Sequence, residues 1–147
     1  MEAPIFPAST PDGSPKQYMY RARMFQEAAR DMPDYKANEQ FWPKYALLCH
    51  AAELALKAFV RSQSAKGIVL PVQQLHNHDL LGWYHLAVHG GLNHSKDMEA
   101  AVSLLGEHHR HSFMRYPEPM PKPASSLISA SSEIDNLITM IATAPSL

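Results

Sequence analysis

The sequence predicts an all-α fold built as one helical bundle, and three observations lead to this prediction. Of the 147 residues, 46% are hydrophobic, which is enough for one sizeable core. Apolar residues recur at three- and four-residue steps in five segments, which is the periodicity of a helix. No segment shows the alternation that indicates a β-strand. We divide the chain into an extended N-terminal arm over residues 1–13 and a single bundle domain over residues 14–147.

The first predicted helix follows the proline-containing arm. Ser14 is the expected N-cap, and Pro15 suits the first helical position because an N–H there would have no partner within the helix. The helix is expected to end before Pro33. Its predicted buried stripe consists of Tyr18, Ala22, Phe25 and Ala29.

The second predicted helix begins near Phe41–Pro43 and continues to about Ser64. It is apolar on nearly all sides, so we expect it to be the central helix. Its polar side chains follow each other in one narrow stripe, which consists of His50, Glu53, Lys57 and Arg61. A polar group on a buried helix is costly unless it is paired or hydrated, so the stripe has two interpretations. Either it lines a polar cleft that faces His78 and Asp79, or its members are internal pairs.

Three more helices complete the predicted bundle. One starts at His78–Asp79 and ends at Gly90–Gly91, one is capped by Ser95 and reaches about Met114, and one runs from about Ala124 to Ala142. Between the last two, the prolines at residues 117–123 exclude helix and favour a polyproline-like connector.

Composition excludes several classes of protein. The formal net charge is −1, so no long-range field attracts nucleic acid or an anionic membrane to the chain as a whole. The sequence has no apolar run long enough for a membrane span and no secretory signal pattern. Its single cysteine, Cys49, excludes a disulfide framework, predicts a cytoplasmic protein and is expected to be a core residue.

Histidine is the unusual feature of the composition, with nine residues. His85 and His89 have the four-residue spacing that lets two imidazoles on one helix bind zinc or nickel. His50 and Glu53 resemble half of a di-iron Glu-x-x-His motif in reversed order, but the remaining ligands of such a site are not visible. The alternative is that these histidines are solvated or satisfied within the core.

A second polar cluster closes the fourth predicted helix. Its members include His108, Arg110 and His111, which could bind phosphate or serve as acid–base groups because histidine titrates near neutral pH. A polar helix end exposed to water explains the cluster as well.

Three segments in order resemble one protein family. They are HAAELALKAFV (His50 to Val60), HDL (His78 to Leu80) and RYP (Arg115 to Pro117), and the second helix starts at Trp42–Pro43. Their order and spacing from about Ser14 to Ala142 resemble the HEPN-like (higher eukaryotes and prokaryotes nucleotide-binding) helical domains.

This resemblance implies an antiparallel bundle of four or five helices that forms a homodimer. We expect no cofactor. Members of the family bind nucleotides, act on RNA as ribonucleases in defence and toxin–antitoxin systems, or pair with a nucleotidyltransferase. The residues that match the family pattern are Glu53, Lys57, His78, Asp79, Arg115 and Tyr116. Lys57 with Asp79, and Glu53 with Arg115, are the interhelical pairs that we expect.

The chain departs from the ribonuclease members of this family. These carry an Arg, four to six residues and then a His, whereas Arg110 is followed at once by His111 and Arg115 by no His. We therefore expect a non-catalytic accessory or nucleotide-binding homodimer. The alternatives are a metal-independent ribonuclease and a histidine-based metal-binding bundle. Trp83, Tyr84 and the apolar last helix are the expected dimer face because they offer more apolar surface than a bundle of this size must bury.

Overall fold

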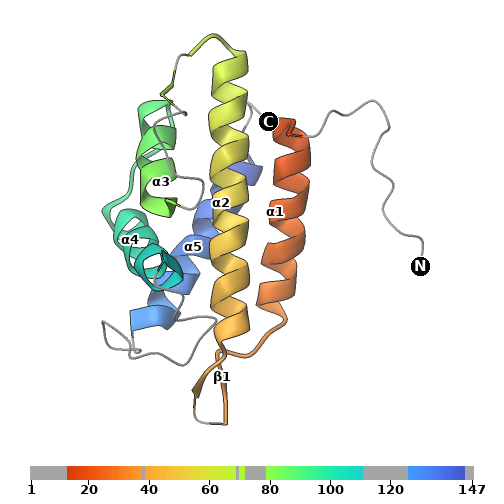
Figure 1. Ribbon diagram of the computed structural model, residues 1–147, viewed down its shortest axis with the longest axis vertical. Coiled ribbons are helices and arrows are strands. Elements are labelled where there is room, and N and C mark those ends of the chain that lie inside the picture. The colour runs from red at the N-terminus through yellow and green to blue at the C-terminus, as the bar shows by residue number, and fades with distance from the viewer. Residues whose placement is uncertain (1–12, 38, 69, 72–78, 111–125, 145–147) are drawn as a thin grey trace, which may run out of the picture.

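The computed structural model describes residues 13–37, 39–68, 70–71, 79–110 and 126–144, and within them the prediction of an all-α bundle is confirmed (Figure 1). A short antiparallel hairpin of β1 and β2 joins the first two helices. The elements are α1 (Pro15–Arg30), β1 (Tyr35–Lys36), β2 (Glu39–Gln40), α2 (Trp42–Ala65), α3 (Leu80–His89), α4 (Lys96–Arg110) and α5 (Ser126–Ala142).

Side chains cap the N-termini of α1, α3 and α4, as the sequence predicted for α1 and α4. The Ser14 hydroxyl accepts a hydrogen bond from the Gln17 N–H at 3.2 Å, and Pro15 occupies the first turn of α1. Ser95 does the same for α4 through the Met98 N–H at 3.3 Å. Asp79 lies just outside α3 as its N-cap, where its carboxylate accepts from the Gly82 N–H at 3.0 Å.

Helix α2 is the central helix, as predicted. It packs against α1, α3, α4 and α5, and Figure 1 shows it running between α1 and α3. The reason is the composition of α2, because small and large apolar side chains project from nearly all of its sides. Tyr45, Leu56 and Val60 are fully buried. No helix of the described residues is both long and apolar enough to cross a membrane.

Two expectations differ from the structure. The hairpin was not foreseen, because strands of two residues are too short to show alternation. Trp83 and Tyr84 are only 4% and 0% exposed, so they belong to the core and cannot supply a dimer face. The apolar side of α5 is also buried, since Ile134, Leu137 and Ile138 are inaccessible.

The expected extension of the fourth helix to Met114 and the proline connector at residues 117–123 lie outside the described residues.

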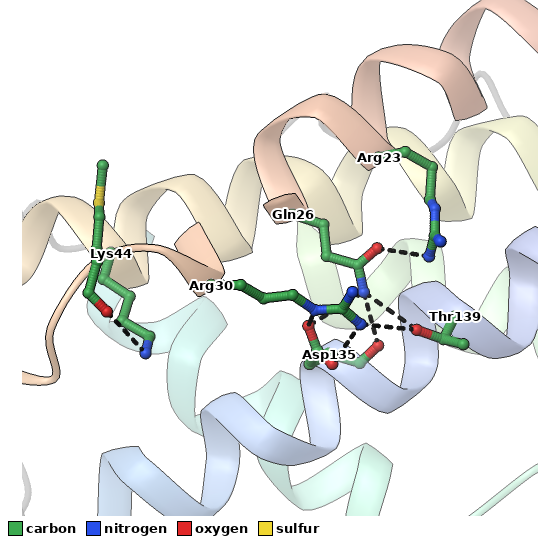
Figure 2. A network of polar contacts seen from close by, with 7 residues as sticks. Arg23, Gln26, Arg30, Lys44, Asp135 and Thr139 are labelled. Atoms are coloured by element: carbon green, nitrogen blue, oxygen red, sulfur yellow. Dashed lines mark hydrogen bonds and ion pairs between the residues drawn. The ribbon is translucent and has the colours of Figure 1, made fainter. Parts of the chain in front are cut away.

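A polar network ties the first helix to the last one (Figure 2). Gln26 on α1 is fully buried, and its Nε2 lies 3.1 Å from the Asp135 carbonyl oxygen, Asp135 Oδ1 and Thr139 Oγ1. Arg30 donates to both carboxylate oxygens of Asp135 at 2.9 Å, and Arg23 donates to Gln26 Oε1 at 2.8 Å. Burial raises the pKa of Asp135, but the hydrogen bonds from Arg30 and Gln26 outweigh burial and lower it overall. This network fixes the axial position of α1 against α5.

Candidate functional site

The main candidate site is a groove between α1 and α2 with a volume of about 880 Å³. This volume lies within the range of small-molecule sites in proteins. One wall comes from α1 and the other from α2. The lining residues are Gly13, Gln17, Tyr18, Arg21, Met24, Phe25, Ala28, His50, Glu53, Leu54 and Lys57.

The α2 wall contains a buried ion pair. Lys57 Nζ lies 3.2 Å from Glu53 Oε2, one helical turn apart, and the two side chains are only 12% and 6% exposed. The Lys57 ammonium also lies 5.3 Å from the centre of the Trp83 ring, which adds a cation–π contact from α3. These contacts hold Lys57 between the groove and α3. Of the predicted polar stripe on α2, Glu53 and Lys57 thus form an internal pair, and this pair also lines the groove.

The two ends of the groove differ in character. At one end the Phe25 and His50 rings meet edge to face, with centroids 4.6 Å apart, and Met24, Ala28 and Leu54 are close by in the lining. At the other end lies Gly13, near the N-terminus of α1. The aromatic end offers a surface for stacking a planar group.

At the Gly13 end of the groove, one guanidinium lies beside the lining. Arg61 lies over the Tyr18 ring at 4.7 Å and donates to the Tyr18 hydroxyl at 3.2 Å. A Cβ atom placed on Gly13 would lie 3.6 Å from Arg61 Nη1, so this guanidinium borders the groove. The charge of Lys57 in the lining is balanced by Glu53, so the positive character of this end comes from Arg61 and from the positive end of the α1 helix dipole. The groove thus runs from a cationic end to an aromatic end.

The structure shows which carboxylate pairs with Lys57. Its partner is Glu53 on the same helix, and Asp79 is engaged as the N-cap of α3, so the predicted Lys57–Asp79 pair does not form. A pair one turn apart on one helix needs no fixed distance between helices, which makes it the easier arrangement. Of the predicted cleft residues, the groove brings together His50, Glu53 and Lys57.

Several predicted site residues cannot be placed. His78, His111, Arg115 and Tyr116 lie outside the described residues, as does any Glu53–Arg115 pair. His108 and Arg110 belong to the last turn of α4, and their side chains are also outside the described part.

The histidine pair predicted for a metal site, His85 and His89, is not part of the groove lining. His85 and His89 are exposed on α3, and His85 Nε2 bonds Glu99 Oε1 at 3.0 Å, while His94 Nε2 lies 3.4 Å from Glu99 Oε2. The hydrogen bond from His85 lowers the pKa of the Glu99 carboxyl. Within the described residues no group of three or more His, Cys, Asp or Glu side chains is arranged to hold a metal ion.

Cys49 is the core residue that the sequence predicted. It is 1% exposed, and its thiol points to the Leu105 carbonyl oxygen at 3.6 Å. Burial raises the pKa of the thiol to about 12, so it is protonated at neutral pH and unsuited to nucleophilic chemistry.

The α1 wall of the groove was not foreseen from the sequence. Gln17, Arg21, Met24 and Ala28 follow each other at four- and three-residue steps, which places them on one face of α1. The spacing of these four residues is visible in the sequence. It marks a second stripe on α1 beside the predicted buried stripe of Tyr18, Ala22, Phe25 and Ala29.

No family model, curated protein or solved structure shows significant similarity to this chain. The family resemblance drawn from the sequence segments therefore stays a prediction.

Proposed function

We propose that this protein is a non-catalytic, nucleotide-binding accessory module that acts as a homodimer and binds its ligand in the groove between α1 and α2. The observation that carries this proposal is the change in character along the groove. Its cationic end suits a phosphate group, and its aromatic end suits a base. Glu53 in the lining is a hydrogen-bond acceptor that a base amino group or a ribose hydroxyl could use.

Two further considerations support binding rather than catalysis. Arg110 is followed at once by His111, and Arg115 by no His, so the sequence lacks the Arg, four to six residues and then His that the ribonuclease members carry. The resemblance of three ordered segments to HEPN-like domains also favours a nucleotide or RNA ligand. In this family a nucleotidyltransferase is a frequent partner, and we extend the proposal to such a partner protein.

The test is isothermal titration of the purified chain with AMP, ATP and GTP. We expect binding to the wild type and roughly tenfold weaker binding to His50→Gln, because the substitution removes the ring that packs against Phe25. His89→Gln is the matched control, since this exposed histidine on α3 is not one of the residues that line the groove. Absence of heat with every nucleotide, together with no nucleotide retained in native mass spectra, would refute the proposal.

A further inference from the structure

A second cavity lies at the end of the bundle where three helices finish. Its volume is about 530 Å³, and its described lining residues are all different from those of the groove between α1 and α2. The walls come from the C-terminal ends of α2 and α5 and from the turn that follows α3. A volume of this size is within the range of small-molecule sites.

Part of the lining is apolar. Phe59 on α2 is 5% exposed, Leu92 in the turn after α3 is 7% exposed, and Met140 on α5 is half-buried. These three side chains come from three different segments, so they surround one space rather than cover one helix face. They suit a branched aliphatic or aromatic side chain, which gains by leaving water.

Another part of the lining favours a positively charged donor. The C-terminal end of a helix carries a partial negative charge, and the ends of α2 and α5 both border the cavity. Gln63 Nε2 donates to the Gly90 carbonyl oxygen at 2.6 Å, which ties the end of α2 to the end of α3. Gln63 Oε1 is buried without a hydrogen-bond partner among the described residues, a costly state for an acceptor. An ammonium group bound against Gln63 would supply the missing donor.

Lys66 gives the same cavity a positive charge. It follows the last turn of α2, its side chain is exposed, and no Asp or Glu is among the described residues that line the cavity. An ammonium of this kind is a partner for a carboxylate. The cavity thus combines an apolar part, acceptors for an ammonium and a cation for a carboxylate. An α-amino acid carries the three matching groups on one carbon atom.

We propose that this cavity binds a free apolar α-amino acid, of which leucine, methionine and phenylalanine are examples. The amino acid's ammonium group lies at Gln63 Oε1 and the helix ends, and its carboxylate pairs with Lys66. Its side chain packs on Phe59, Leu92 and Met140. This site goes beyond the proposed nucleotide groove and does not depend on it.

The first test is isothermal titration of the full chain with leucine and three analogues. N-acetylleucine lacks the ammonium charge and leucinamide lacks the carboxylate, and we expect each to bind roughly tenfold more weakly than leucine. Serine keeps both charges without the apolar side chain and should also bind at least about tenfold more weakly. Leucine should bind equally well when AMP is present, because the two sites share no described lining residue.

A variant of Lys66 tests the assignment of the carboxylate. Lys66→Gln should weaken leucine binding roughly tenfold but should not weaken leucinamide binding, because leucinamide has no carboxylate to lose a partner. Lys96→Gln is the matched control, since this exposed lysine on α4 is not one of the residues that line the cavity. Circular dichroism checks that both variants remain folded.

The outcomes separate this site from the nucleotide groove. Absence of binding with leucine, methionine and phenylalanine up to about 10 mM overturns the proposal. Leucine binding that tolerates both N-acetylation and Lys66→Gln overturns the assignment of the charged groups, and competition by AMP overturns the separation of the two sites. None of these results decides on nucleotide binding, which rests on the titrations with AMP, ATP and GTP.

Discussion

Replacing Gln26 with leucine tests whether a buried amide holds α1 against α5. The substitution keeps the side-chain volume nearly constant, so it leaves little cavity behind. The change in the free energy of unfolding then comes mainly from the lost hydrogen bonds. The amide nitrogen has two hydrogens, so it makes at most two good bonds among its three acceptors at 3.1 Å, and Oε1 accepts a charged one from Arg23. At about 0.5–1.5 kcal/mol for each bond, partly offset by the burial of leucine, we expect Gln26→Leu to destabilise the fold by about 2 kcal/mol.

The assay is urea unfolding followed by circular dichroism, with Arg30→Gln as the matched variant. Arg30 bonds the same carboxylate in a bidentate pair, but its side chain is 46% exposed, so its loss should cost only about 0.5–1 kcal/mol. A smaller cost for Gln26→Leu than for Arg30→Gln would refute the view that the buried amide is the main contact.

The same network predicts the dependence of stability on pH. The pKa of Asp135 is lowered in the folded state, because the hydrogen bonds from Arg30 and Gln26 outweigh the effect of burial. The stability that Asp135 contributes is therefore fully present above its unfolded pKa and is lost as the pH falls through the folded pKa. Gln26→Leu removes one of these hydrogen bonds, so the variant should lose less stability than the wild type between neutral and strongly acidic pH. An equal acid loss in both proteins would contradict this assignment.

Three further predictions follow from other parts of the fold. Lys57→Met leaves the Glu53 carboxylate buried without its ammonium and should cost about 3 kcal/mol in urea unfolding, most of which the double variant with Glu53→Met should regain. Cys49 should react with a thiol reagent only at the rate of unfolding, so rapid labelling of the native protein would contradict its burial. Gly91→Ala should lower the melting temperature, because Gly91 has φ +116° and an added Cβ would lie 3.3 Å from Gln63 Nε2; an unchanged melting temperature would contradict this strain.

Local signals in the sequence predicted the helices well. Ser14 with Pro15 located the start of α1, and the apolar composition of α2 located the centre of the bundle. These features depend on residues within a few positions of each other, so a single sequence is sufficient to recognise them. The hairpin between α1 and α2 could not be recognised in the same way, because it is set by a short turn rather than by a periodic pattern.

Long-range partners could not be predicted from local patterns. Gln26 and Asp135 are 109 residues apart, and the sequence around either residue does not indicate that the other is its partner. The one available signal was position: Gln26 lies between Ala22 and Ala29 on the buried side of α1, where a polar side chain needs a partner. For Lys57 we predicted Asp79 as the partner, whereas the structure pairs it with Glu53 one turn away on the same helix.

The position of α1 connects the network with the groove proposed as the nucleotide site. One side of the helix packs on α2 through Ala22 and Phe25, and another side is bonded to α5 through Gln26. A helix held on two sides presents its third side in a fixed orientation, and binding then costs less conformational entropy than it would for a mobile helix. We therefore expect Gln26→Leu to weaken nucleotide binding without altering any residue of the groove lining. Isothermal titration of that variant at a temperature where it remains folded would refute the link if its nucleotide affinity matched that of the wild type.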